Sequence, residues 1–166
     1  SLGAKTLNDA LEKHLDSFIE NDIQLIWQCG KRYHEELSAR VKKHPLIHLM
    51  AFIEDMPSVY AVADLVISRA GGSTISELIL LSKPSILVPS PNVAEDHQTK
   101  NALSLVDRGA AGMVKDVEAS EKLVPETIAL LKDSQKMAEL QKGIDAVEKH
   151  DAAHEIAEEI LSLMKK

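Results

Sequence analysis

Two kinds of segment alternate along the chain. The first kind is short and almost continuously apolar, and Gly, Pro, Asp or Ser residues bound it. Such runs are typical of strands that are buried on both faces of a parallel sheet. They occupy residues 23–27, 47–52, 65–67, 85–88 and 110–114.

The second kind of segment carries apolar residues at helical spacing. One stripe consists of Leu7, Leu11, Leu15, Phe18 and Ile19, and another of Ile156, Ile160, Leu161 and Met164. Further helices are predicted near residues 32–43, 56–63, 73–82, 95–108, 120–132 and 134–149. Alternating strands and helices predict βαβ crossovers. The expected fold is therefore α/β, a Rossmann-like parallel sheet with helices on both faces.

The first residues form a small-residue turn, Ser1-Leu2-Gly3-Ala4, that leads directly into a helix. A glycine-containing turn before a helix normally follows a strand, so the sequence predicts that the first strand of the domain is missing. A flexible N-terminus without a missing partner is the alternative. The length of 166 residues is that of one domain, so residues 1–166 are expected to form a single unit.

The composition narrows the function classes. With 19 Lys and Arg against 26 Asp and Glu, the net charge of -7 argues against a nucleic-acid binder. Apolar runs stay well short of the roughly 20 residues of a membrane-spanning helix, and the opening residues do not resemble a secretory signal. The single cysteine, Cys29, excludes an internal disulfide and suits a reducing compartment, where it is expected to be a core residue.

Metal and hydrolase motifs are also lacking. Pro45 separates His44 from His48, and His150 and His154 are expected to straddle the start of the last helix, so neither pair predicts a metal site. The sequence contains neither an Asp-x-Asp pair nor a G-x-S-x-G nucleophile turn.

The most informative segment is residues 64–77, a buried strand followed by a glycine pair and a helix that is expected to open at Ser73 or Thr74. Glycines let a ligand approach the backbone, and a helix N-terminus favours an anion. Glu77 has two possible roles: it can close a capping box with Thr74, or it can bind a ribose diol. The segment is neither a G-x-G-x-x-G fingerprint nor a Walker A loop.

Two other loops lie at predicted carboxyl ends of strands, where such sheets bind ligands. Residues 89–101 bring together Asp96, His97, Gln98 and Asn101, which suit the recognition of sugar hydroxyls or simply start a polar helix. In residues 51–57, the main chain of Phe52 and Ile53 could read a planar base, while Asp55 is the expected N-cap of the next helix.

Taken together, these segments resemble the C-terminal half of the MurG family, which transfers N-acetylglucosamine in bacterial cell-wall synthesis. The resemblance covers the whole chain. The Gly-Gly-Ser-Thr-x-x-Glu element of residues 71–77 is shared by many two-domain GT-B glycosyltransferases. The Asp-His-Gln-x-x-Asn-Ala element of residues 96–102 makes the resemblance much more specific.

The resemblance implies that this domain holds the donor, UDP-N-acetylglucosamine, as a substrate and binds neither metal nor cofactor. It implies a phosphate contact for Ser1 and a main-chain contact between Ile53 and uracil. The same resemblance gives Glu77 the ribose. The implied pyrophosphate contacts are Gly72, Ser73 and Thr74, and the implied sugar contacts are His97 and Gln98 with Asn101 in the same element.

The resemblance also implies an inverting transfer to the muramoyl C4 hydroxyl of a lipid-linked precursor at the inner face of the cell membrane. In that family, the N-terminal domain carries the acceptor site, the candidate general base and the membrane contact. Because it is not represented in these residues, the fragment alone is expected to lack a catalytic residue and to be inactive. The alternatives are another GT-B UDP-sugar transferase or epimerase, or a non-catalytic nucleotide-binding domain.

Overall fold

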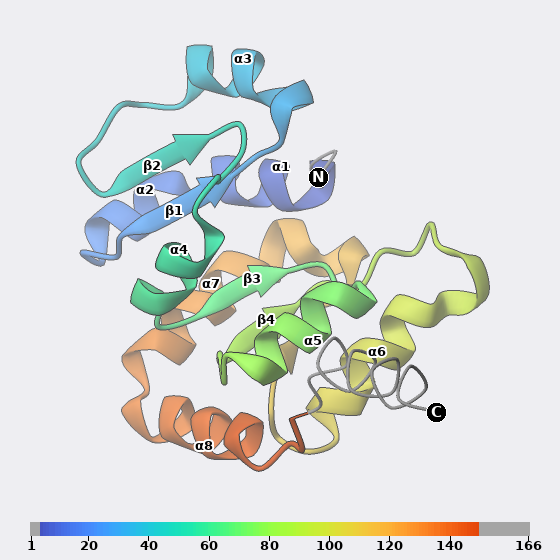
Figure 1. Cartoon of the computed structure of the whole chain (residues 1–166). Helices are drawn as coiled ribbons and strands as arrows, with labels where there is room; N and C mark the ends of the chain where they lie inside the picture. The colour runs from blue at the N-terminus through green and yellow to red at the C-terminus, as the bar shows by residue number, and fades with distance from the viewer. Residues whose placement is uncertain (1–3, 150–166) are drawn as a thin grey trace, which may run out of the picture.

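A computed structural model of the chain describes residues 4–149 (Figure 1). The helices are α1 (Lys5–Lys13), α2 (Leu15–Glu20), α3 (Lys31–Arg40), α4 (Met56–Val62), α5 (Gly72–Leu80), α6 (His97–Val106), α7 (Ala119–Lys132) and α8 (Ser134–Asp145), with 3-10 turns η1 (Ala94–Asp96) and η2 (Asp116–Glu118). The strands are β1 (Leu25–Gln28), β2 (Ile47–Met50), β3 (Val66–Ser68), β4 (Ser85–Leu87) and β5 (Gly112–Met113).

All strand pairs are parallel, which confirms the predicted α/β fold. The strands form two sheets, with the orders β1-β2 and β3-β4-β5, rather than the single sheet that the sequence suggested. In the first sheet Leu25 aligns with Ile47, and in the second Ile67 aligns with Ile86.

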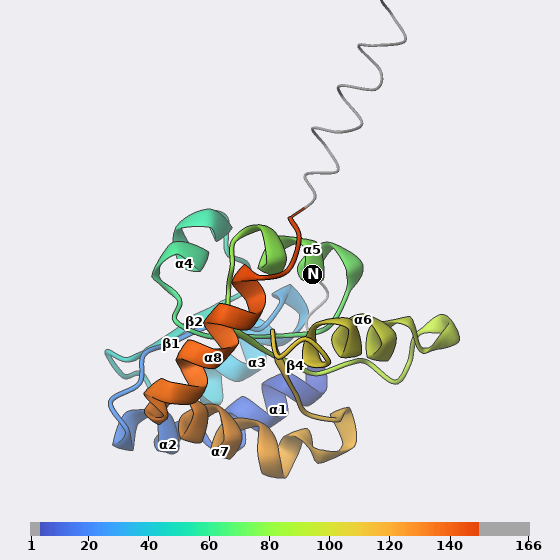
Figure 2. The same ribbon diagram turned by 90° about the horizontal axis from the view of Figure 1, so that it is seen from below.

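Helices cover both faces of the strand layer, as the view from below shows (Figure 2). The side chains of β4 alternate between the two faces. Ile86 and Val88 pack with Leu7 of α1 and Leu123 of α7, whereas Leu87 packs with α5 and α6. Helices α1 and α7 also contact the first sheet, because Leu11 and Val124 belong to the cluster around Trp27. The two sheets therefore rest on one shared helical layer.

Three local expectations need correction. The first helical stripe is split at His14, whose φ of -112° and ψ of 23° end α1 before α2 begins. Only β4 is fully buried along its length; β1, β2 and β3 are partly accessible. Glycine 72 lies inside α5, so that helix starts earlier than Ser73. The stripe from Ile156 to Met164 and the pair His150 and His154 lie outside the described residues.

Polar contacts join the N-terminal helix α1 and the following His14 to η2 and α7, late in the chain. Thr6 of α1 donates a hydrogen bond of 3.2 Å to Asp116, and Lys13 forms a 2.5 Å ion pair with Glu121. The imidazole of His14 lies 2.9 Å from the carbonyl oxygen of Ser120. Buried apolar contacts between α1 and α7 lie beneath these polar ones. Helix α1 therefore belongs to the same packed layer as an element more than a hundred residues later.

The backbone of helix α8 lies very close to the backbone of the turn that follows α6. A Cβ atom built on Gly143 would lie 2.1 Å from the carbonyl oxygen of Gly109 and 3.0 Å from the Cα of Ala110. Gly109 itself has a φ of +64°, which favours glycine. The absence of a side chain at Gly143 permits this contact, and the next residue, Ile144, is fully buried in the cluster that includes side chains of α5 and α6.

Candidate donor site

The site predicted from the sequence lies where the parallel strands end. Figure 1 shows β1 and β3 pointing the same way, with the start of α5 directly beyond β3. A cavity of about 760 Å³ reaches this edge and is lined there by Ile53, Thr74 and Glu77. The structure therefore brings together three residues from two of the predicted ligand loops.

The start of α5 has no side-chain cap. Its N-cap is Gly71, with φ -67° and ψ 150°, and no side chain accepts a hydrogen bond at this end. The expectation that Ser73 or Thr74 caps the helix is therefore wrong, because the helix begins before both. The first N–H groups of α5 remain available to an anion from outside. A Cβ atom on Gly72 would meet nothing within 4 Å, so the approach to this end is open.

Glu77 does not form the capping box. Its carboxylate accepts a hydrogen bond of 3.1 Å from the phenol of Tyr60, which comes from α4. Glu77 is exposed, whereas Tyr60 is buried. The contact holds the carboxylate at the mouth of the cavity, beside Thr74. Of the two interpretations that the sequence left open, the capping box is excluded in this geometry and the role toward a diol stays a prediction.

Burial, and then the neighbouring Glu77, raise the pKa of Tyr60 to about 12. We expect an ultraviolet titration to show this late ionisation, with Tyr33 serving as the second tyrosine of the chain. Glu77→Gln should lower the pKa of Tyr60 only partly, because burial is the larger cause. The pKa of Tyr60 is higher in the folded than in the unfolded state. The contribution of its protonated phenol to the free energy of unfolding is therefore present below pH ~10 and is lost as the pH rises toward 12. An unchanged titration in Glu77→Gln would contradict the contact.

A side chain of β1 holds the segment around Ile53 that was predicted to bind a base. The backbone N–H of Ile53, a buried residue, donates a hydrogen bond of 2.8 Å to the side-chain oxygen of Gln28. A base that used this N–H would have to displace Gln28. Asp55 is the predicted N-cap of α4, since it accepts hydrogen bonds from the backbone and hydroxyl of Ser58. Those hydrogen bonds hold the pKa of Asp55 below its ordinary value.

The start of α6 anchors the neighbouring loops. The Gln98 side-chain oxygen accepts a hydrogen bond of 2.9 Å from the N–H of Ser90. The Asn101 amide donates one of 3.0 Å to the carbonyl of Ala70, directly before the glycine pair. Both residues thus support the loops, a role the sequence did not predict. Their contacts with a sugar remain a prediction, as do those of His97, which is exposed as the first residue of α6.

Glu95 and Asp96 enter this helix with φ angles of 54° and 52°. Left-handed backbone is uncommon for residues other than glycine, and it is enriched at functional sites. Asp96 also accepts a 2.6 Å hydrogen bond from Thr99. The segment that was predicted to bind a sugar therefore contains two consecutive left-handed residues just before α6, which an ordinary polar helix start does not require.

An ion pair between Arg69 and Asp116 was not predicted from the sequence. Arg69 donates hydrogen bonds of 3.0 and 3.2 Å to the carbonyls of Val88 and Pro89, and it lies 2.5 Å from an oxygen of Asp116. Asp116 in turn accepts from Thr6 of α1. The pair thus joins the ends of β3 and β4 to α1. The sequence signal that could have predicted this pair is the position of Arg69, a cation between a buried strand and a glycine pair.

The described residues contain no group of three or more His, Cys, Asp or Glu that could hold a metal ion. Instead, the ring of His44 accepts a hydrogen bond from the N–H of Leu46, and the ring of His48 lies 2.8 Å from the side-chain amide of Gln24. Cys29 is a core residue, as predicted: it is fully buried, and burial raises the pKa of its thiol. A raised pKa disfavours the thiolate that a nucleophile needs. Ser1 lies outside the described residues.

Comparison with protein families decides what kind of domain this is. Residues 1–158 match the family described as "Glycosyltransferase family 28 C-terminal domain". The chain belongs to this family. Among curated proteins, a transferase of Parabacteroides distasonis is 45% identical over all of the chain, and one of Bacteroides fragilis is 49% identical over 98% of it. Both are named UDP-N-acetylglucosamine--N-acetylmuramyl-(pentapeptide) pyrophosphoryl-undecaprenol N-acetylglucosamine transferase.

Solved structures agree with the assignment to glycosyltransferase family 28. MurG of Acinetobacter baumannii superposes with a TM-score of 0.78 at 30% identity over 98% of this chain. The glycosyltransferase VinC superposes with a TM-score of 0.63 at 17% identity, which supports the fold alone. The chain spans 46% and 44% of the length of the two curated relatives and 47% of the Acinetobacter structure. No helix within residues 4–149 is both long and apolar enough to cross a membrane.

Proposed function

We propose that this domain binds UDP-N-acetylglucosamine as the donor half of an inverting N-acetylglucosaminyltransferase. The complete enzyme would move the sugar to the muramoyl C4 hydroxyl of a lipid-linked peptidoglycan precursor. The observation that carries the proposal is identity of 45% and 49% to transferases of that name over 98–100% of this chain. Such extensive identity favours this reaction over another GT-B activity or a non-catalytic domain.

The geometry supports a donor site in which different residues bind the pyrophosphate, the ribose and the uracil. The uncapped start of α5 suits the pyrophosphate, because helix N-termini stabilise negative charge. As the bond to the sugar breaks, charge would grow on the departing UDP, and these N–H groups would stabilise it. The Glu77 carboxylate, held by Tyr60, suits the paired hydroxyls of a ribose. The main chain of Ile53 at the same cavity edge suits the uracil, which would displace Gln28 from the Ile53 N–H.

We place the acceptor site, the general base and the membrane contact in the remainder of the longer protein. Tyr60, which lines the cavity, is a poor candidate for that base, because its raised pKa keeps the phenol protonated near neutral pH. The lipid-linked acceptor would reach the bound donor from that remainder, at the inner face of the cell membrane. The part represented here would supply binding and charge stabilisation.

Calorimetric titration with UDP and ADP tests the nucleotide assignment. We expect UDP to bind and ADP to bind at least tenfold more weakly, since a purine exceeds a slot sized for a pyrimidine edge. Glu77→Ala should weaken UDP binding by about 1–2 kcal/mol through the lost ribose hydrogen bonds. Tyr60→Phe, which keeps the carboxylate, is the matched control and should cost less. Equal affinity for UDP and ADP would contradict the proposal.

Gly72→Leu tests the pyrophosphate contact separately. Because a Cβ atom at Gly72 meets nothing within 4 Å, the chain should fold normally while the new side chain covers the start of α5. We expect UDP binding to weaken about tenfold, and uridine binding to change much less. The measurement is calorimetry with both ligands, after circular dichroism has confirmed the fold. Equal losses for UDP and uridine would move the phosphates away from α5.

A further inference from the structure

A hydrogen bond within the domain already occupies the main-chain group that suits the uracil. Ile53 is buried, and its N–H donates a hydrogen bond of 2.8 Å to the side-chain oxygen of Gln28. A buried N–H requires an acceptor, and leaving it without one is costly. Gln28 supplies that acceptor in the ligand-free domain. The N–H has a single hydrogen to donate, so a base that uses it competes with Gln28.

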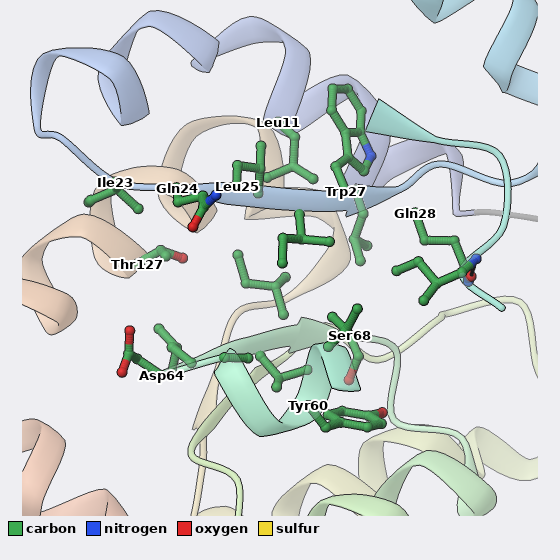
Figure 3. A pocket seen from close by; sticks show the side chains of 18 of the residues that line it. Leu11, Ile23, Gln24, Leu25, Trp27, Gln28, Tyr60, Asp64, Ser68 and Thr127 are labelled. Carbon is green, nitrogen blue, oxygen red and sulfur yellow. Dashed lines mark hydrogen bonds between the residues drawn. The ribbon is translucent and has the colours of Figure 1, made fainter. Parts of the chain in front are cut away.

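Gln28 can leave this position without giving up another hydrogen bond. It is the last residue of β1, and its side chain lines the cavity of about 760 Å³, a groove between β1 and β3 (Figure 3). Within residues 4–149, the bond to Ile53 is the one hydrogen bond of the Gln28 side chain. The backbone is held separately, because Gln28 aligns with Met50 of β2 and the N–H of Cys29 donates to Met50. Rotation of the side chain into the cavity is therefore enough to free the Ile53 N–H.

The carboxamide of Gln28 and one edge of uracil carry the same chemical groups. Each presents a carbonyl oxygen beside an N–H, and neither is charged. Either can accept the hydrogen of the Ile53 N–H with similar geometry. The Gln28 side chain thus offers Ile53 the acceptor that a bound uracil would offer.

We propose that the Gln28 carboxamide is an intramolecular competitor of the uracil base. It holds the Ile53 N–H in the free domain, rotates into the cavity when a uridine nucleotide binds, and returns as the nucleotide leaves. The inference rests on the proposed function, since it takes the base to bind at Ile53. Gln28 thereby lowers the affinity of the site for the donor and for the product UDP, and it keeps the buried N–H paired between turnovers.

The free energy of one hydrogen bond sets the size of this effect. A site that a side chain holds closed binds its ligand more weakly, in proportion to the fraction of molecules in which it is open. For a neutral hydrogen bond, the factor is about three- to tenfold. Deleting the carboxamide also leaves the Ile53 N–H without its acceptor in the free domain, which favours the bound state as well. Both effects tighten binding.

Gln28→Ala tests the proposal by calorimetric titration with UDP, uridine and inorganic pyrophosphate, which has no base. The matched control is Gln24→Ala. Gln24 is also a glutamine that lines the cavity, but it lies at the opposite end, and its amide contacts His48 (Figure 3). We expect Gln28→Ala to bind UDP and uridine about three- to tenfold more tightly than the parent and to bind pyrophosphate equally. Gln24→Ala should match the parent for every ligand.

A second variant reverses the sign. In Gln28→Glu, a carboxylate oxygen should accept from the Ile53 N–H more strongly than the carboxamide does, so uridine should bind more weakly than to the parent. Uridine is the ligand here because the added charge would also repel the phosphates of UDP. Amide hydrogen exchange without ligand gives an independent measurement: the Ile53 amide should exchange faster in Gln28→Ala than in the parent.

Weaker uridine binding by Gln28→Ala would overturn the proposal, because Gln28 would then be a contact of the base. Unchanged uridine binding, or an equal gain for pyrophosphate, would overturn it too. In each of these outcomes UDP still binds, so the donor assignment survives and only the role of Gln28 is lost. Failure of UDP to bind the parent would instead contradict the proposed function, and the competition with it.

Discussion

Replacing Gly143 by alanine should destabilise the domain by about 1–3 kcal/mol. Alanine in place of glycine normally stabilises a helix by roughly 1 kcal/mol. Here the added Cβ would lie 2.1 Å from the carbonyl oxygen of Gly109, so α8 or the turn at Gly109 must move. Both are backbone, and overpacking a core costs 1–3 kcal/mol or more. The buried Ile144 would move with the helix.

Urea unfolding of Gly143→Ala measures this cost. Gly72→Ala is the matched control, because it also adds one methyl group to a helical glycine but meets nothing within 4 Å. We expect the control to stay within about 0.5 kcal/mol of the parent. Similar stability for both variants would show that α8 does not approach Gly109 as closely as described.

Removing the guanidinium in Arg69→Met should cost about 2–3 kcal/mol of stability. The variant leaves the carboxylate of Asp116 without its ion-pair partner and leaves the carbonyls of Val88 and Pro89 without a donor. Breaking a fully buried pair costs about 3–5 kcal/mol. The side chains of Arg69 and Asp116 are 23% and 18% exposed, so solvent screening reduces that figure.

The surface pair Lys5–Asp9 provides the comparison for Arg69→Met. Its side chains are 70% and 53% exposed, so Asp9→Asn should change stability by less than about 0.5 kcal/mol. Chemical unfolding of both variants at one pH gives the difference directly. A loss below about 1 kcal/mol in Arg69→Met would mean that the carbonyls and Asp116 find water instead.

Sequence patterns predicted the order of strands and helices because apolar periodicity reports burial locally. They failed where tertiary context decided the outcome. The stripe from Leu7 to Ile19 has one helical face, yet the backbone of His14 ends α1 before α2 begins, and the ring of His14 contacts Ser120 of α7. Likewise, apolar runs at β1 and β3 predicted full burial, but the groove between them leaves both partly accessible.

The candidate site was predictable in its position and less so in its contacts. A strand followed by a glycine pair correctly located the uncapped start of α5, and its binding of an anion stays a prediction. The partner of Glu77 could not be predicted, because Tyr60 arrives from a different helix and no local spacing connects them. Asn101 similarly contacts Ala70, which is 31 residues away, and Gln98 contacts Ser90 in the preceding loop, so their polar character alone suggested only a ligand.

The contacts between α1 and the segment containing η2 and α7 bear on the order in which parts of the domain fold. Thr6 and Lys13 find their partners 110 and 108 residues later along the chain. Closing so long a loop carries an entropic cost that must be met before these contacts form. Synthesis proceeds from the N-terminus, so α1 emerges from the ribosome long before α7 exists. The side chain of Leu11 can pack early against Trp27 and its neighbours, whereas Leu7, which packs with Leu123, completes its contacts only after α7 has been synthesised.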